Sequence, residues 1–496
     1  MSEETAAEGP TQSRYGFTWK WSPLHPTESE IRSMLYSYDE LASEALDRLD
    51  VLSPPTPSRP QSQSQTPSRS QSQDQTQAQA QPSDCPFSGQ RDLYKLLQKH
   101  AGDDPVVGKL WDEVSTVPDW VDWDQLARGQ EVVRQYYGQI LLGLFFRSLV
   151  GGMSAWRVVE TLSRTGGFGV AVCRRRLLET LQHYLDVVDD LAGLRPGGKG
   201  FVSSVRVRLL HASVRRRLLR LERSRPGYYD AASWGVPIND LHCAGTVSVY
   251  STAVAWTALP MQGVRLSEAQ TADYLALWRW VGHLLGAPVD FMATPARAKA
   301  MFESIIRSEI KPSQNSQIIA NNILTAETGV PPLNASREYL CAAAHCLNGS
   351  ELASDLGIDE PRPYYRLLVW LQCYTLLFFS WLYPYMPTSL QERRHRRYMR
   401  MGYEMVTNRK KGGIGEHTTF EFQYLPDIGK MTELGSWRKA VKAGRSETNW
   451  VVVACLLAGL VTGFAVVYAH LVVRDHGPGW IGLGPGSLGT SIRAWT

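Results

Sequence analysis

The chain has 496 residues, of which 43% are hydrophobic and sixteen are Trp, so it can form a large buried core. Its formal net charge of +4 is small for this length and does not indicate a nucleic-acid partner. Seven Cys without paired Cys-x-x-Cys motifs are typical of reduced thiols, not of a disulfide framework. The cluster of Cys341, His345 and Cys346 lacks a second ligand pair, so no zinc site is expected there.

The N-terminal region, residues 1–52, is polar and predicts one helix over residues 28–52. Its first residues are acidic and no apolar segment follows them, so we expect no signal peptide. Residues 53–84 consist almost entirely of Ser, Gln, Pro, Thr and Arg. Such a composition cannot bury enough apolar surface to offset its chain entropy, so we predict a disordered linker, with partner binding as the alternative.

Residues 85–435 have apolar residues at three- and four-residue spacings and few alternating runs, which predicts one large helical domain. Ser267 is a plausible N-cap, with Gln270 as its capping-box partner. The glycines at 166, 167 and 169 have no Lys-Ser/Thr after them, so they indicate a helix-terminating turn and not a phosphate loop. The expected helices cover residues 132–150, 156–163, 173–191, 204–222, 241–258, 267–285 and 295–309.

Two of these helices together have the residues that a haem site needs. Arg176, Glu179 and Thr180 are spaced so that they project from one helical face. About thirty residues later, His211 lies in an apolar stretch flanked by arginines. A haem requires an imidazole for the iron, apolar walls for the macrocycle and cations for its two propionates. The ordinary alternatives are a core or surface histidine at 211 and a solvated arginine at 176.

An ordered set of sequence blocks lies between Trp111 and Gly286. One block is Arg176-Leu-Leu-Glu-Thr180, and another is Val205-Arg-Val-Arg-Leu-Leu-His-Ala-Ser-Val-Arg215. The other blocks are residues 118–130, 149–152, 164–167, 237–239 and 278–286. In this order the blocks resemble the MpaB/latex clearing protein (rubber oxygenase) family.

The resemblance implies an all-α, globin-like haem domain that binds haem b and uses dioxygen to cleave a double bond of an isoprenoid chain. It implies that His211 is the proximal iron ligand and that Arg176 and Thr180 lie beside the haem. Glu160 lies at a spacing from His211 similar to that of a glutamate proposed as the catalytic base in the rubber oxygenase.

One position departs from the rubber oxygenase pattern. Glu179 stands where that enzyme has a lysine able to cap the iron, so the resemblance implies an open or water-bound sixth position here, as in the fungal branch.

Side-chain chemistry suggests roles for these residues. Arg176 can pair with a propionate or polarise bound dioxygen, and the Thr180 hydroxyl can donate to an iron-bound oxygen. Either Glu160 or Glu179 is a candidate to move an allylic proton, although both suit helix-face ion pairs equally well. Arg208 and Arg215, with Arg206, are candidate propionate partners, and a simple basic helix face is the alternative.

Residues 450–473 contain no Asp, Glu, Lys or Arg and predict a transmembrane helix. At 1.5 Å per residue such a helix is about 36 Å long, enough to cross a hydrocarbon core of roughly 30 Å. Basic residues between 438 and 445 precede it, so the positive-inside rule predicts a cytosolic domain and a lumenal tail at residues 474–496. This topology leaves the sequons at Asn334 and Asn348 unused.

Residues 364–387 are also apolar, but their polar and aromatic content favours a core or interfacial helix over a second span. The basic cluster at residues 393–397 follows, and it suits contact with anionic headgroups as well as simple solvation. With either location the domain would lie near the bilayer, where a long prenyl chain could enter directly.

The sequence therefore predicts a haem b oxygenase, anchored by one helix in the endoplasmic-reticulum membrane, that acts with dioxygen on a lipophilic substrate. Two alternatives remain open. One is a haem oxygenase or peroxidase that modifies another lipophilic metabolite without chain cleavage. The other is a catalytically silent, membrane-anchored scaffold that recruits pathway partners through its Gln/Ser-rich segment.

Overall fold

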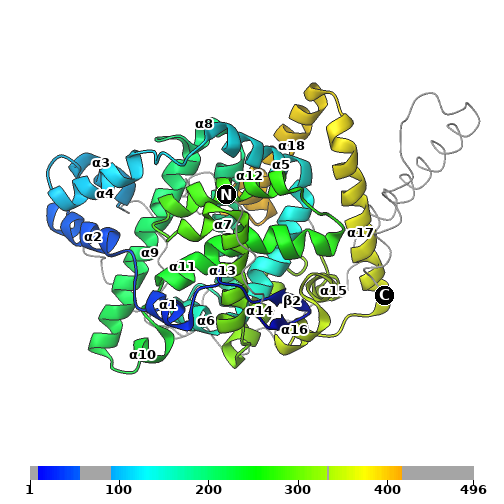
Figure 1. Ribbon diagram of the computed structural model, residues 1–496, viewed down its shortest axis with the longest axis horizontal. Coiled ribbons are helices and arrows are strands. Elements are labelled where there is room, and N and C mark those ends of the chain that lie inside the picture. Colours follow the sequence, from blue (N-terminus) through cyan, green and yellow to red (C-terminus); the bar gives the residue numbers. More distant parts are fainter. Residues whose placement is uncertain (1–8, 56–90, 332–333, 416–496) are drawn as a thin grey trace, which may run out of the picture.

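A computed structural model describes residues 9–55, 91–331 and 334–415. The described chain is almost wholly helical (Figure 1), as expected for an all-α protein. The predicted linker lies almost entirely outside these residues, and the predicted transmembrane helix at 450–473 and the tail at 474–496 lie wholly outside them.

A short β-hairpin that the sequence analysis missed precedes the helices. Strand β1 (Thr11–Arg14) pairs antiparallel with β2 (Phe17–Lys20). Tyr15 and Gly16 make the two-residue turn with φ of 50° and 73°, the conformation that such hairpins favour. Trp19 is buried in a cluster with Phe302 of the helical domain, Phe17 packs edge-on against the same Phe302 ring, and Arg14 donates to the Arg307 carbonyl at 3.1 Å, so several side chains attach the hairpin.

The single helix expected over residues 28–52 is wrong, because two helices occupy this stretch. Helix α1 covers Glu28–Met34 and α2 covers Glu40–Leu52. Asp39 separates them, because its carboxylate caps α2 by accepting from the amide of Ala42 at 3.1 Å. Helix α2 buries Ala42, Leu46 and Leu49 in the main core. This N-terminal segment is therefore packed on the helical domain.

Several predicted helices agree closely with the structure. The helix at Pro295–Glu309 has the expected bounds, and Ser267 and Gln270 form the expected capping box. Gly166, with φ of 69°, lies in the expected turn. The remaining α-helices are α3 (Leu93–His100), α4 (Pro105–Ser115), α5 (Trp123–Leu142), α6 (Trp156–Arg164), α7 (Val170–Val188), α8 (Leu191–Leu194), α9 (Lys199–Ser224), α10 (Ala231–Trp234), α11 (Asp240–Tyr250), α12 (Glu268–Leu284), α13 (Pro295–Glu309), α14 (Gln314–Ala326), α15 (Arg337–Asn348), α16 (Ser350–Asp355), α17 (Pro363–Leu382) and α18 (Thr388–Thr407).

Two of the predicted helices contain a π-helical segment. The stretch expected at 132–150 is the end of α5 followed by the π-helix η1 (Gly143–Val150), and the stretch at 241–258 ends in the π-helix η3 (Val254–Ala258). Short 3₁₀ turns complete the chain at η2 (Gly151–Ser154), η4 (Pro260–Gln262), η5 (Asp290–Ala293), η6 (Tyr383–Tyr385) and η7 (Arg409–Lys411). Because π-helical turns are rare and often mark functional sites, η1 and η3 direct attention to the region between them.

The carbonyl of Phe146 in η1 is tied to α15. Asn348 is fully buried, and its Nδ2 donates to the Phe146 carbonyl at 2.9 Å and to the Ala344 carbonyl at 3.0 Å. A Cβ on Gly151 would lie 2.1 Å from Asn348 Oδ1, so only glycine permits this approach. The amide of Asn348 therefore braces the widened helix.

The core is centred on α12, which lies against α5. Gly129 of α5 approaches so closely that an added Cβ would lie 2.4 Å from the Asp273 carbonyl. Trp278 and Trp280 of α12 are buried, and the Trp280 indole donates to the Leu194 carbonyl at 3.0 Å. Trp278 packs against Tyr184 and Tyr250 at ring distances of 6.2 and 4.9 Å, so the core supports both of these side chains from behind.

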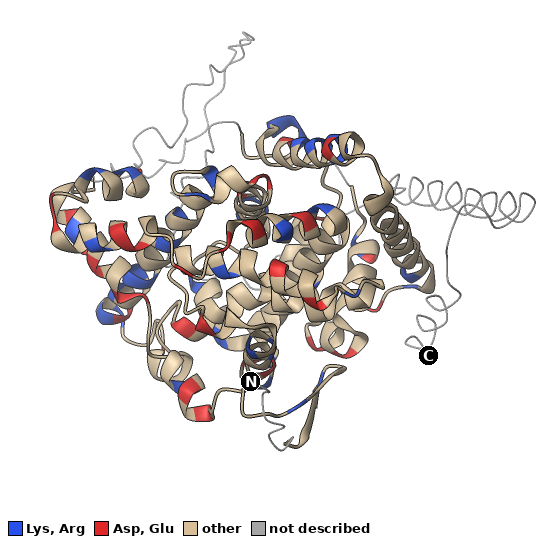
Figure 2. Cartoon of the chain, turned by 45° about the horizontal axis from the view of Figure 1, so that its top comes forward, with Lys and Arg blue, Asp and Glu red and all other residues tan. Residues whose placement is uncertain are grey.

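Helix α17 and the following α18 form a bent pair at one edge of the molecule (Figures 1 and 2). Residues 363–385 make up the one helix in the described part of the chain whose length and composition would allow it to cross a membrane. Only 22% of its apolar window is buried within the protein.

Candidate active site

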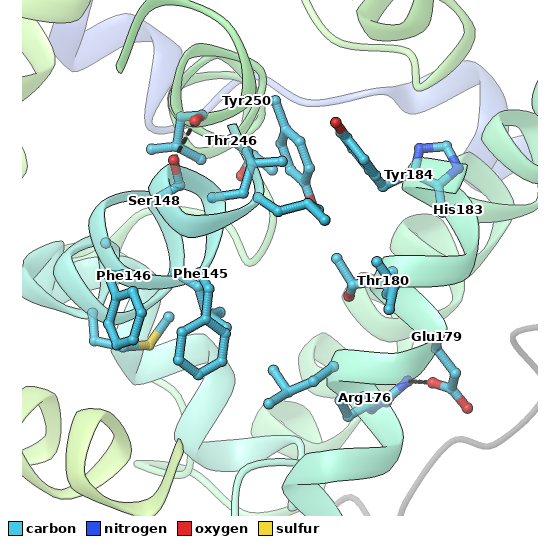
Figure 3. A pocket seen from close by; sticks show the side chains of 18 of the residues that line it. Phe145, Phe146, Ser148, Arg176, Glu179, Thr180, His183, Tyr184, Thr246 and Tyr250 are labelled. Carbon is cyan, nitrogen blue, oxygen red and sulfur yellow. Dashed lines mark hydrogen bonds and ion pairs between the residues drawn. The ribbon is translucent and has the colours of Figure 1, made fainter. Parts of the chain in front are cut away.

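A cavity of about 1010 Å³ lies between α7, α9, α11, α13 and η1, and most of its lining is apolar. Figure 3 shows Thr180 and Tyr184 of α7 facing Phe145 of η1 and Tyr250 of α11 across this space. Such a volume suits a large, mainly apolar ligand.

Helix α7 supplies the polar side of the cavity. Arg176, Thr180 and Tyr184 follow one another at four-residue spacing and all line the cavity, as does Glu179. Thr180 is not covered by neighbouring side chains, so its surface is open to the cavity. The predicted grouping of Arg176, Glu179 and Thr180 is therefore present in space.

Glu179 is held by two arginines. Its carboxylate accepts from Arg175 Nε at 3.0 Å and from Arg176 Nη1 at 3.2 Å, the second pair being visible in Figure 3. The Arg176 guanidinium is thereby fixed at the cavity wall. Glu179 would have to exchange one of these partners before it could accept a proton.

His211 comes to the same cavity from α9, together with Val207 and Val214, which lie four residues before and three residues after it. Burial and the nearby Arg215 guanidinium lower the pKa of His211 to about 4, so the ring is neutral at pH 7. Its Nδ1 is buried and finds no hydrogen-bond partner among the described residues. A neutral imidazole with an unsatisfied nitrogen is suited to binding a metal or a polar ligand.

Two further histidines that the sequence analysis missed also line the cavity. His183 Nδ1 lies 2.8 Å from Ser203 Oγ, and burial together with the neighbouring His211 ring lowers its pKa to about 4. Burial and Arg157 lower the pKa of His242 to about 3. The spacing of His183, three residues after Thr180, is the signal that could have identified it.

Comparisons with known proteins show which part of the chain is similar to a known family. Residues 134–378 match the model of the ER-bound oxygenase mpaB/B'/rubber oxygenase catalytic domain. Through this region the chain belongs to the MpaB/rubber oxygenase family. The matched residues include α7, α9 and α11, and therefore every side of the cavity described above except the parts contributed by α18 and η7.

Two relatives illustrate the family. The rubber oxygenase of Streptomyces sp. (strain K30) is 23% identical over 257 residues, which cover 51% of this chain and 60% of that protein. The chain thus matches little more than half the length of this relative. The similarity to the structure of latex clearing protein in the closed state covers 77% of this chain and 95% of the latex clearing protein chain. The sequence identity is 19% and the TM-score is 0.49.

One of the carboxylates predicted for the MpaB/rubber oxygenase site lies elsewhere. Glu160 of α6 is not among the residues that line the cavity. It is buried, forms an ion pair with Arg164 at 2.6 Å and accepts from Asn315 Nδ2 at 3.0 Å. Both carboxylate oxygens are therefore engaged in structural contacts. The family spacing that selected Glu160 did not predict this orientation.

Arg208 and Arg215 do not line the cavity either. Arg208 pairs with Asp39 at 2.7 Å and Glu113 at 2.8 Å. The Arg215 guanidinium donates to the carbonyls of Pro237 and Ile238 at 3.2 and 2.8 Å. Around α9 both lie about a quarter-turn from Val207 and less than that from His211, and their side chains reach the N-terminal helices and residues 237–238 instead. The predicted propionate role finds no support in this arrangement.

Other charged side chains line the cavity instead. Glu309 of α13 lines the cavity, pairs with Arg157 at 2.7 Å, and burial raises its pKa. Arg174 and Lys411 line the cavity near α7 and α18. Among the described residues there is no group of three or more His, Cys, Asp and Glu side chains arranged to hold a metal ion. A haem iron needs one protein imidazole and not such a cluster.

Proposed function

We propose that this chain is a haem b-dependent oxygenase that uses dioxygen to cleave or oxygenate an isoprenoid or another lipophilic substrate. The observation that carries the proposal is the apolar cavity to which α7 brings Arg176 and Thr180 and α9 brings His211. Membership of the oxygenase family supports the reaction class. The predicted globin-like arrangement, with haem between helices, is part of the proposal.

The residues of the cavity fit a haem. His211 offers a neutral imidazole whose Nδ1 has no partner among the described residues. The walls around it are apolar, with Val207 and Val214 on its own helix. Cationic groups for propionates are present at the cavity wall in Arg174, Arg176 and Lys411. Bound haem would supply an iron centre that binds and activates dioxygen.

The protein would then position the reactants and exclude water. Thr180 and Arg176 can donate hydrogen bonds to an oxygen atom in the cavity, because both project from α7 into its lining. Tyr184 and Tyr250, held from behind by Trp278, present flat aromatic surfaces against which an unsaturated chain can pack.

Glu309 is the better placed carboxylate for moving a proton. It lines the cavity, only 2% of its surface is exposed, and its Oε2 has no hydrogen-bond partner among the described residues. Burial raises its pKa, which favours proton acceptance from a substrate near neutral pH. Only one oxygen of Glu309 pairs with Arg157, whereas both oxygens of Glu179 accept from arginines and Glu160 does not line the cavity.

The membrane anchor is also a proposal. The hydrophobic run at residues 450–473 suits a single span, with the domain in the cytosol and attached to the endoplasmic reticulum. These residues lie outside the described part of the chain.

The visible absorption spectrum of the purified full-length chain tests the haem. We expect a Soret band, and we expect His211→Ala to lose or shift it while His242→Ala retains it. His183→Ala distinguishes His183 from His211 as the iron ligand, because His183 is also neutral and its ring lies near that of His211. A folded protein that stays colourless when haem is supplied would refute the oxygenase and favour the scaffold.

Product analysis under dioxygen, by mass spectrometry on a polyprenyl substrate, separates chain cleavage from oxygenation without cleavage. Shortened carbonyl products indicate cleavage. Products of unchanged chain length that contain added oxygen indicate the second enzyme class.

A further inference from the structure

Helix α17 presents a row of apolar and aromatic side chains to solvent. Leu367, Tyr374 and Trp381 are 64%, 58% and 52% exposed, and their seven-residue spacing places them on one face of the helix. Tyr364 and Tyr385 extend this row at its two ends and are 55% and 69% exposed. A continuous exposed row of this kind is uncommon on a soluble protein and marks an interaction surface.

The opposite face of α17 is fixed to the protein. Ser380 Oγ accepts from Gln139 Nε2 at 2.8 Å, and Gln372 accepts from the hydroxyl of Tyr339. A Cβ on Gly138 of α5 would lie 2.6 Å from Leu376, so the two helices pack as closely as glycine permits. Gln372 and Ser380 therefore point into the protein, away from the exposed row. The charged residue of α17, Arg366, pairs with Glu360 near the start of the helix.

Helix α18 adds a row of positive charge. Arg393, Arg396, Arg397 and Arg400 are all exposed, and their spacing places them on one face of the helix. Across the described chain from Pro363 to Thr407, the acidic residues are Glu392 and Glu404. Figure 2 shows the contrast between α17, whose one charged residue is Arg366, and the basic α18 that adjoins it.

The cavity reaches the surface on the same helix. Met401 lines the cavity yet is 54% exposed, and it lies four residues after Arg397. On the inner face of α17, Gln372 and Leu376 also line the cavity. The two helices with the apolar and basic rows thus form part of the cavity wall.

We propose that α17 and α18 dock this domain on a bilayer that contains anionic phospholipids, with α17 lying in the plane of the interface. Tyr and Trp side chains favour the boundary between headgroups and acyl chains, and the arginines of α18 match the negative charge of the headgroups. A lipophilic substrate then passes from the bilayer into the cavity beside Met401. This entry route rests on the proposed function, whereas the docking does not.

The neighbours of α17 favour an interfacial position over a span. The hydroxyl of Tyr383 donates to Glu131 of α5 at 2.7 Å, and Arg134 lies one turn further along α5. Glu131 is exposed. If α17 crossed the membrane, these charged groups would be drawn toward the hydrocarbon, which is costly. A helix immersed by half its width leaves them in water.

Photocrosslinking of the full-length chain tests the docking. p-Benzoylphenylalanine replaces Trp381 in one variant and Tyr374 in a second, and the matched control has it at the buried Val369 of the same helix. Each protein is irradiated with vesicles of phosphatidylcholine containing phosphatidylserine, and adducts are identified by mass spectrometry. Circular dichroism first establishes that each variant folds. We expect phospholipid adducts at residues 374 and 381, at least about fivefold more than at 369.

Charge removal tests the basic row. The triple variant Arg393→Gln, Arg396→Gln, Arg397→Gln should lower the lipid adduct yield at residue 381 by about fivefold or more on phosphatidylserine vesicles, since each surface arginine adds to the attraction. The matched control removes three exposed arginines near the end of α9, namely Arg220, Arg223 and Arg225. We expect the control to leave the yield unchanged.

Other products would overturn the proposal. Adducts to a second copy of the chain would make the exposed row a self-association surface. Adducts to another segment of the same chain would mean that the protein covers it. Equal lipid labelling at 369 and 381 would also refute the docking. The crosslinking does not depend on haem, so a normal Soret band without lipid adducts removes the docking alone, and lipid adducts on a colourless protein remove the oxygenase alone.

Discussion

The two sides of α9 show how one helix can serve two purposes. On one side, Arg208 and Arg215 donate to carboxylates and carbonyls of the N-terminal helices and of residues 237–238. On the other side, His211 lies at a large cavity, and its Nδ1 has no hydrogen-bond partner among the described residues. Buried polar groups are almost always satisfied in a stable fold. The side whose arginines are paired holds the structure together, and the side with the unpaired imidazole nitrogen is the one that can bind a ligand.

The largest expected effect comes from the satisfied side. Arg208→Met leaves Asp39, whose side chain is 9% exposed, without its charged partner. We expect the free energy of unfolding to fall by about 3–5 kcal/mol, because an uncompensated buried charge is costly. His211→Phe, on the unsatisfied side, should change it by less than about 1.5 kcal/mol. Urea denaturation of both variants measures the contrast, and equal losses would break it.

Lowering the pH should reduce the free energy of unfolding, because His242 is buried in its neutral form. Its folded pKa of about 3 lies below an unfolded value near 6.5, so the unfolded chain binds the additional proton. The stability due to the neutral ring is complete above about pH 6.5 and is lost as the pH falls toward 3. We expect His242→Phe to reduce the slope of unfolding free energy against pH by up to about 1.4 kcal/mol per unit in this window. Denaturation at pH 4, 5, 6 and 7 measures the slope. An unchanged slope would show that His242 is solvated.

A smaller effect is expected where α9 meets α7. Ser203→Ala removes the hydroxyl that lies 2.8 Å from His183 Nδ1 in a buried setting. The loss should be about 1–2 kcal/mol, typical of a buried hydrogen bond. Ser213→Ala, whose hydroxyl donates to the Leu209 carbonyl of the same helix, is the control, and it should cost less. Thermal unfolding of the two variants ranks them.

The smallest effect on stability is expected for Arg216 of α9. Arg216 pairs with Asp47 at 2.6 Å and Asp50 at 2.8 Å, and the Asp47 side chain is 66% exposed. Ion pairs that reach solvent contribute little, so Arg216→Gln should cost at most about 1 kcal/mol. The difference should shrink further at high salt. A salt-independent loss above 2 kcal/mol would show that this pair behaves like Arg208.

The sequence predicted local features better than the directions in which side chains point. The capping box at Ser267 and the bounds 295–309 depend on neighbouring residues, and both were correct. The common face of Arg176 and Thr180 follows from helical spacing alone. Residue roles stay predictions, since geometry reports position and not chemistry.

The features that could not be predicted all depend on distant contacts. Spacing placed Arg208 about a sixth of a turn around the helix from His211 but could not predict that Asp39, from far earlier in the chain, lies on that side. Glu160 had a family-like position, yet Arg164 and Asn315 engage it away from the cavity. The hairpin at Thr11–Lys20 was missed because two four-residue strands give almost no periodic signal.

The burial of the Asn348 amide makes this fold incompatible with glycosylation at Asn348. Asn348 stands in an Asn-Gly-Ser sequon, and its Nδ2, the atom that a glycan would occupy, donates instead to the Phe146 carbonyl in η1. A copy threaded into the secretory lumen would present this sequon to the glycosylation machinery before it folds. The attached sugar would then prevent α15 from closing against η1.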